Sequence, residues 1–212
     1  MSDVTGTRKL DVVATIKDGI QIGLRNILPI LANVALWALT VWIPYLNVGT
    51  TIGLMVGIVS KASKGEAISI TEIFDPKYRK YMGEFFLTSG LIGVGVGIGT
   101  AFFIIPGIII GVAWSLSLLL VIDKGKNPTE ALTISNNYTY GYKGRMVGIY
   151  IVACLAFFIL QVILIGIATA TRSAGFMSFM GFIVFLTVLF EVFVFIGLQA
   201  SVYKQLVGDN AN

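Results

Sequence analysis

Hydrophobic residues gather into long runs that are separated by short polar segments. Six runs stand out, at about 27–45, 48–60, 85–105, 107–122, 146–169 and 176–203. A helix that crosses a bilayer needs roughly 20 mainly apolar residues, and the second run is short enough to be tilted or to cross only in part. The pattern predicts an all-α integral membrane protein, one domain over 1–212, with six transmembrane helices as three hairpins at about 27–60, 85–122 and 146–203.

Amphipathic segments precede the predicted hairpins. In the N-terminal segment 8–26, hydrophobic residues follow one helical stripe opposite charged residues; the stripe comprises Leu10, Val13, Ile20, Leu24 and Ile27. Ser69 and Glu72 have the spacing of a capping box, and Asp75-Pro76 and Asn127-Pro128 favour a helix start. We therefore expect interfacial helices along the cytoplasmic headgroups. Either an internal threefold repeat of about 60–70 residues or the general amphipathicity of loops near a membrane explains this recurrence.

Composition strengthens the membrane assignment and narrows the chemistry. Charged residues make up 12% of the 212 residues, about half the usual share in a soluble domain, and the mean hydropathy is +0.89. The chain has no histidine and a single cysteine, Cys154, which excludes internal disulfides, histidine metal sites, Ser-His-Asp triads and Cys-His dyads. We expect no enzymatic activity and no cofactor. The first residues lack a secretory signal pattern, so we expect the chain to enter the membrane through its own helices.

The basic residues are distributed unevenly over the predicted connections. Fourteen of the 15 lysines and arginines fall at the N-terminus, between the second and third runs, between the fourth and fifth runs, or after the sixth. The connections on the other side contain one, Arg172. The positive-inside rule then places both termini in the cytoplasm, and the net charge of +4 favours contact with anionic lipids of the inner leaflet. No nucleic-acid-binding motif accompanies this charge.

A glycine-rich stretch at 90–111 lies in the third and fourth runs. It does not match the GxGxxG motif, because Ile98 occupies the third glycine position, and no Walker lysine follows it. Its glycines form small-xxx-small pairs instead, which let helix backbones approach closely in lipid; they are Gly93, Gly95, Gly97, Gly99, Gly107 and Gly111. We expect the third run to be the packing hub of the bundle or of an oligomer, and Gly97→Leu to disrupt assembly.

One ionisable residue, Glu191, lies near the middle of the sixth run. A charged side chain at the bilayer centre costs about 2.5–3.5 kcal/mol on insertion scales, and desolvation favours its protonated form. One hypothesis is a proton- or cation-responsive site that faces a cavity. The other is a protonated glutamate bonded to Gln161, Asn33 or Ser115, because such polar groups commonly join membrane helices.

The segment 106–150 carries a resemblance to a known group of proteins. It reads PGIIIGVAWSLSLLLVIDKGKNPTEALTISNNYTYGYKGRMVGIY. The matching positions are Pro106, Gly107, Asp123, Glu130, Ala131, Leu132, Ser135 and Gly141. The segment resembles a motif of bacterial integral membrane proteins, which include uncharacterised six-span proteins and the membrane domain attached to some glycerophosphodiester phosphodiesterases. The resemblance implies a helical bundle in a bacterial cytoplasmic membrane. The phosphodiesterase activity of the fusions belongs to a separate domain with metal-binding histidines, and it is not carried over to this histidine-free sequence.

Three functional hypotheses follow from these patterns. The first is a non-enzymatic membrane protein that acts through close helix packing, as a homo-oligomer, a scaffold or a partner subunit. The second is a channel or secondary transporter for a small solute or ion that uses Glu191, since interrupted helices often line such sites. The third is a membrane-embedded enzyme acting on lipid through Asp75, Asp123 or Glu130, although their spacing matches no catalytic or metal motif. We favour the first.

Overall fold

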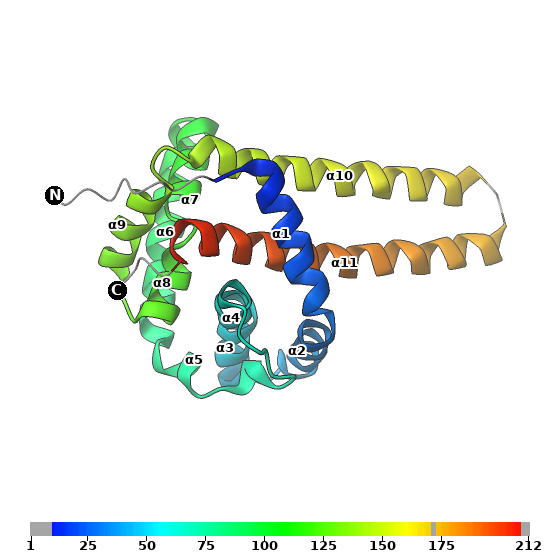
Figure 1. Cartoon of the computed structure of the whole chain (residues 1–212). Coiled ribbons are helices and arrows are strands. Elements are labelled where there is room, and N and C mark those ends of the chain that lie inside the picture. Colours follow the sequence, from blue (N-terminus) through cyan, green and yellow to red (C-terminus); the bar gives the residue numbers. More distant parts are fainter. Residues whose placement is uncertain (1–9, 171–172, 209–212) are drawn as a thin grey trace.

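The computed structural model describes residues 10–170 and 173–208, and those residues fold into helices without a β-strand (Figure 1). In chain order the elements are α1 (Val12–Arg25), α2 (Ile27–Thr40), α3 (Pro44–Ile52), the π-helix η1 (Gly53–Gly57), α4 (Ile58–Lys64), the 3₁₀-helix η2 (Glu72–Phe74), α5 (Lys77–Lys80), α6 (Met82–Phe102), α7 (Ile104–Ala113), α8 (Ser117–Lys124), α9 (Pro128–Thr139), α10 (Lys143–Ala170) and α11 (Ala174–Leu206). The all-α prediction is confirmed for these residues. Arg172 and the first residues of the predicted segment 8–26 lie outside them.

Several segments are long and apolar enough to cross a membrane. There are four among the described residues: Met82–Phe102, Ile104–Lys124, Lys143–Ala170 and Ala174–Leu206. The pair α1 and α2 would make a fifth, but these two helices meet at a bend of 70°. The first two predicted spans are not single long helices, because α2 has 14 residues and the π-helix η1 divides the second. The structure therefore supports a membrane protein with four to five candidate spans.

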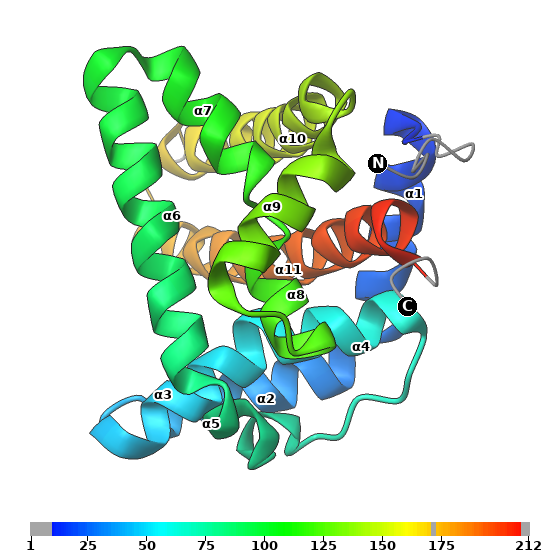
Figure 2. The same cartoon turned by 90° about the vertical axis from the view of Figure 1, so that its left-hand side faces the viewer.

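The long helices do not share one direction. α10 and α11 run side by side and project from the rest of the molecule (Figure 1). Figure 2 views this pair nearly end-on, and there α6 runs from the bottom of the molecule to its top, across the pair. Spanning helices tilt by about 20° from the bilayer normal on average, so most helices that span one bilayer are closer to parallel than α6 and the α10–α11 pair are here (Figure 2). The predicted layout of six spans in three hairpins is therefore not confirmed.

Contacts between the segments follow a cyclic order. The helix α1 packs on α11, the segment η2–α5 packs on α3 and η1, and α9 packs on α7 and α8 (Figure 2). Each of these three segments precedes one helix pair and packs on the returning helix of the pair before it. For α1, the pair before it is the last one in the chain, which closes the circle. This order is what an internal threefold repeat would produce.

Glycines bring α1 and α11 into close contact. Gly19 and Gly23 lie one turn apart on the buried face of α1, and a Cβ atom at Gly19 would stand 2.8 Å from the Leu198 Cα atom. A Cβ atom at Gly197 would collide with the Gly19 carbonyl oxygen. The hydrophobic stripe of this segment is divided: Val13 and Leu24 are 76% and 48% exposed, whereas Leu10 is buried in the core and Ile20 packs against it. The glycine face of α1 therefore packs on protein, and the expectation that this segment lies along the headgroups stays a prediction.

The glycines of α6 divide between its two sides. Gly95 and Gly99 face the returning helix, and a Cβ atom at Gly99 would lie 3.0 Å from the Gly107 nitrogen. On the opposite side, a Cβ atom at Gly93 or Gly97 would meet no atom within 4 Å. Three of the five glycines in this run face open space. The helix α6 nevertheless packs against α3, α5, α7, α8 and α9, whereas α11 packs against α1, α4 and α10. Gly95 and Gly99 thus support close packing of α6 within the chain and Gly93 and Gly97 do not, so the prediction that the third run is the packing hub of the bundle or of an oligomer stays a prediction.

The core lies where the ends of α4, α8 and α11 meet. Its buried side chains include Val59, Leu119 and Val202, one from each of these helices. The outer half of the α10–α11 pair is open by contrast, and Phe158 and Phe179 are 66% and 59% exposed. Large apolar patches of this kind need lipid or other helices as neighbours.

Candidate functional site

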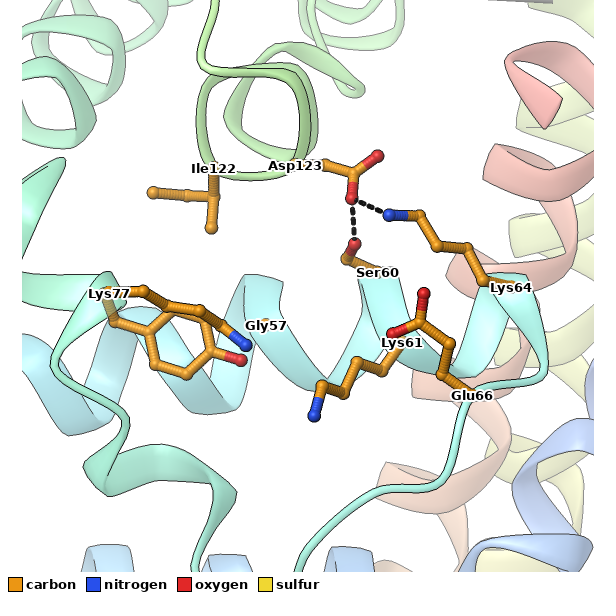
Figure 3. Close-up of a pocket in the computed structure, with 9 residues that line it drawn as sticks. Gly57, Ser60, Lys61, Lys64, Glu66, Lys77, Ile122 and Asp123 are labelled. Atoms are coloured by element: carbon orange, nitrogen blue, oxygen red, sulfur yellow. Dashed lines mark hydrogen bonds and ion pairs between the residues drawn. The ribbon is translucent and has the colours of Figure 1, made fainter. Parts of the chain in front are cut away.

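Asp123, a residue of the predicted motif, lies where α4, α8 and α11 meet. It belongs to the last turn of α8, and its side chain is 3% exposed. One carboxylate oxygen accepts hydrogen bonds from the Ser60 hydroxyl at 2.6 Å and from the Lys64 ammonium (Figure 3). The other oxygen accepts from the Tyr203 hydroxyl at 2.9 Å. Ser60 and Lys64 are four residues apart and so share one face of α4. The carboxylate therefore joins three helices that are distant in the sequence.

A second buried carboxylate, Glu72, ties the segment η2–α5 to α4. Its side chain is 3% exposed. It accepts hydrogen bonds from Lys61 at 2.7 Å, from Lys77 at 3.1 Å and from Tyr78 at 2.7 Å. The prediction that Glu72 completes a capping box with Ser69 is wrong, because bonds from two ammonium groups and a phenol are stronger than one bond from a backbone N–H. Glu72 opens a short 3₁₀-helix instead.

The partners of Glu72 fix its charge at neutral pH. Burial by itself raises the pKa of Glu72, but hydrogen bonds from Lys61, the Tyr78 phenol and a second lysine outweigh burial and lower that pKa to about 2. Burial and the nearby carboxylate raise the pKa of Tyr78, so its phenol stays protonated and donates. The pKa of Glu72 thus lies far from neutrality, whereas a general acid or base works best with a pKa near the operating pH.

Two cavities flank the Lys64–Asp123 ion pair. The smaller has a volume of about 200 Å³ and lies between α4 and the segment that carries Lys77 (Figure 3). Its lining residues are Gly57, Ser60, Lys61, Lys64, Glu66, Lys77, Tyr78, Ile122 and Asp123. The larger has a volume of about 530 Å³, and its lining residues are Ser63, Lys64, Asp123, Lys124, Tyr203, Lys204 and Gly208. Lysines outnumber carboxylates in the lining of both cavities.

Asn33 is a tether between α2 and the segment 69–73. Its side chain is fully buried, and its amide nitrogen donates to the carbonyl oxygens of Pro29 at 2.8 Å and Ser69 at 2.7 Å. Its amide oxygen accepts from the Ile73 nitrogen at 3.0 Å. The Asn33 amide therefore bonds to backbone groups of α2 and of the segment 69–73, which lie outside the α10–α11 pair.

Glu191 and Gln161 belong to the α10–α11 pair. Gln161 donates to the Thr187 hydroxyl at 2.9 Å, and its buried amide oxygen has no partner among the residues that the structure describes. Glu191 is half-buried, and its carboxylate bonds to none of the described residues. The predicted bonds from Glu191 to the two amides or to Ser115 are therefore wrong. Glu191 also lies outside the linings of the two cavities above.

Ser135 bridges the break between α7 and α8. It is buried on α9, where its hydroxyl donates to the Ala113 carbonyl oxygen at 2.7 Å and accepts from the Leu116 nitrogen at 3.2 Å. Glu130 lies in the first turn of the same helix and pairs with Lys126 at 2.9 Å. Both residues therefore shape the connection around α8 and do not reach the cavities.

The remaining motif residues also have local roles. Pro106 falls in the first turn of α7, and Gly107 packs against Thr100 of α6. Gly141 has a φ of +80°, a conformation that favours glycine, and it ends the turn after α9. A Cβ atom at Gly111 would make an ordinary contact, 3.7 Å from a Val96 methyl group. Asp123 is thus the motif residue that reaches both cavities.

Sequence reasoning missed the partners of Asp123. Ser60 and Tyr203 are 63 and 80 residues away from it along the chain, so no local sequence pattern predicts these contacts. One signal was present, because Lys-Gly pairs end the helices α4 and α8 at 64–65 and 124–125. That shared ending marks equivalent positions in two hairpins, and the structure brings both to one cavity.

Comparison of the chain with known proteins identifies no family for it. A scan against protein-family models, a search of curated proteins and a search of solved structures each found no match to the chain. The resemblance in segment 106–150 therefore stays a prediction. Within the described residues, no group of three or more histidine, cysteine or acidic residues is arranged to hold a metal ion. The geometry offers instead ammonium groups around cavities and open apolar helix faces.

Proposed function

We propose that this chain is a multi-pass protein of the bacterial cytoplasmic membrane that acts, without catalysis, by assembling with further copies of itself through α6. The observation that carries this proposal is the outward side of α6. Gly90, Gly93 and Gly97 lie on that side, and a Cβ atom on any of them would meet no atom within 4 Å. We call these three glycines the open glycine face.

The surroundings of the open glycine face suit close helix packing. Phe86, Val94 and Ile98 are each more than half exposed beside it, so the glycines form the floor of a shallow apolar strip. In lipid, a strip of small residues lets a second backbone approach and gain dispersion contacts. On the inward side, Gly99 already allows α7 to approach closely, and Gly95 leaves space for the Trp114 ring that follows α7. The same helix therefore has the shape to hold two neighbours.

We also propose that the six apolar segments insert as three hairpins with both termini in the cytoplasm. The uneven distribution of the basic residues supports this orientation. Since α6 lies across the α10–α11 pair in the structure (Figure 2), insertion requires the helix pairs to turn into a common direction. In this proposal the helix pairs turn relative to an inner layer that stays fixed. We define the inner layer as α4, α8 and the C-terminal end of α11.

The mass of the purified protein in a mild detergent tests the assembly. The chain has a mass of 22.9 kDa, and we expect the wild type to run as a multiple of that mass. Gly97→Leu should run as a monomer, because a leucine side chain fills the strip where the second backbone has to approach. Multi-angle light scattering or native mass spectrometry gives the mass directly.

Gly166→Leu is the matched control for this substitution. Gly166 lies in α10, and a Cβ atom there also meets no atom within 4 Å, so the same change of side chain is made on an open face of another helix. We expect wild-type mass for this variant. A wild type that is monomeric over a wide concentration range, or a Gly97→Leu variant that assembles normally, would refute assembly through α6.

The alternative function is a channel or secondary transporter for a small solute or ion. It is favoured by the unpartnered Glu191 carboxylate and by the buried, unpartnered amide oxygen of Gln161, since unsatisfied intramembrane polar groups often mark ion pathways. In liposomes, Glu191→Gln should then abolish proton or cation flux without changing the assembly. Absence of flux through the wild type would remove this alternative.

A further inference from the structure

The larger cavity lies at the point where the C-terminal ends of three helices converge. Lys64 is in the last turn of α4, Lys124 in the last turn of α8 and Lys204 in the last turn of α11. All three lysines line this cavity of about 530 Å³. Each helix is followed by a glycine with a positive φ, which ends the helix beside the cavity; these are Gly65, Gly125 and Gly208.

Positively charged side chains outnumber negatively charged ones around this cavity. Its lining contains three ammonium groups and one carboxylate, that of Asp123. Lys64 forms an ion pair with Asp123. Lys204 forms an ion pair with Asp18 at 3.4 Å, and both side chains of that pair are partly exposed. Lys124 pairs with no carboxylate among the described residues. Among the described residues, the cavity therefore faces at least one ammonium group whose charge is not balanced by a neighbouring carboxylate.

Helix ends explain part of this arrangement. The C-terminus of a helix carries a partial negative charge, which favours a lysine in the last turn, but the effect falls off within that turn. It does not explain why three lysines from separate helices face the same space, where like charges repel each other. A bound anion would relieve that repulsion, and the volume lies within the range of small-molecule sites.

We propose that this cavity binds a phosphate group, held by Lys64, Lys124 and Lys204. Lysine ammonium groups bind phosphate as point charges, and three of them from three helices surround the space in which the phosphate would lie. Two sources have the same chemistry: the headgroup of an anionic phospholipid and a soluble phosphate. The headgroup suits the position, because these lysines lie on the side that the basic residues assign to the anionic inner leaflet.

The experiment uses the full-length protein in nanodiscs of phosphatidylcholine. In one arm, phosphatidylglycerol is added to the lipid in increasing amounts, and in the other, inorganic phosphate is added to the buffer around pure phosphatidylcholine discs. Native mass spectrometry counts the bound lipid, and the shift of the thermal unfolding midpoint reports either ligand. We expect Lys124→Gln and Lys204→Gln each to weaken binding about fivefold, from about 1 kcal/mol per lysine near an anionic surface.

Lys126→Gln is the matched control, because it removes the same charge two residues from Lys124 but outside the cavity lining. Helix content by circular dichroism confirms that each variant is folded. If the effect is confined to the cavity lysines, phosphatidylglycerol dependence assigns a lipid headgroup and inorganic phosphate dependence assigns a soluble ligand. Failure of both ligands to bind, or equal weakening by Lys126→Gln, would overturn the site. These outcomes are independent of assembly through α6, because none of the three lysines lies on that helix.

Discussion

Two pairs of glycines with the same spacing have opposite surroundings in this molecule. Gly19 and Gly23 of α1 press against α11, where a Cβ atom would collide with the backbone, whereas the space around Gly93 and Gly97 of α6 is empty. The spacing small-xxx-small therefore predicts that a backbone can approach, but it does not say which backbone does. In α1 the neighbour is the last helix of the same chain. For α6 we propose that it is another copy.

The inner layer and the outer helix faces also differ in the interactions that hold them in place. The inner layer contains the buried carboxylate Asp123, and the segment η2–α5 beside it contains a second, Glu72; each has three side-chain donors. The outer side of α6 and the outer half of the α10–α11 pair present apolar side chains to their surroundings. Directional bonds to buried charges fix one geometry, whereas apolar surfaces in lipid slide and exchange neighbours more easily. We therefore expect substitutions in the inner layer to affect folding, and substitutions on the outer faces to affect association.

The largest effect should follow from Glu72→Gln. This change removes the charge that accepts hydrogen bonds from Lys61, Lys77 and Tyr78. Because hydrogen bonds to charged groups contribute about 1.5–3 kcal/mol each and Lys77 keeps its ion pair with Asp75 at 2.9 Å, we expect a loss of about 3 kcal/mol. The measurement is the free energy of unfolding in detergent. Glu66→Gln is the control, since Glu66 is exposed and lines the smaller cavity, and it should change that free energy by less than about 0.5 kcal/mol.

The same carboxylate predicts a pH dependence. The pKa of Glu72 falls from an ordinary 4.5 to about 2 in the folded chain. A carboxyl group with a lowered folded-state pKa stabilises the fold fully above its unfolded value and loses that contribution as the pH falls. Stability should therefore fall between about pH 4.5 and pH 2, and Glu72→Gln should flatten this part of the profile. An unchanged slope in the variant would show that other groups cause the acid sensitivity.

A smaller loss is expected from Gly197→Ala. The added methyl group collides with the Gly19 carbonyl oxygen, and overpacking of this kind costs about 1–3 kcal/mol. Gly181→Ala on the same helix is the control, because a Cβ atom at Gly181 meets no atom within 4 Å. That variant should keep or gain stability, since alanine favours helix over glycine by about 1 kcal/mol. Equal behaviour of the two variants would contradict the close crossing of α1 and α11.

The smallest effect on folding should come from the open glycine face. Gly97→Leu adds a side chain where no atom of the same chain lies within 4 Å, so the free energy of unfolding of the isolated monomer should change by less than about 0.5 kcal/mol. The comparison with Gly197→Ala is sharpest in a detergent that keeps the wild type monomeric. A large loss of monomer stability would mean that α6 has a neighbour within its own chain.

The sequence predicted those features whose causes are local. Asn127 caps α9 by accepting from the Glu130 nitrogen at 2.9 Å, as the Asn-Pro pair predicts. The capping box at Ser69 failed because Glu72 has distant lysines that its local sequence does not reveal. The site at Asp123 depends on residues from three helices, and the direction of each helix pair is set by tertiary packing. Hydropathy can count apolar segments, but it does not determine how those segments are oriented relative to each other.

The most direct test of the central claim is a disulfide cross-link through the open glycine face. In a Cys154→Ser background, which removes the native cysteine, Gly97→Cys is oxidised in native membranes, and Ile163→Cys on the exposed side of α10 is the control. Assembly through α6 predicts a cross-linked dimer for Gly97→Cys at low oxidant, with Ile163→Cys remaining monomeric. A monomeric Gly97→Cys variant, or equal cross-linking of both variants, would contradict it.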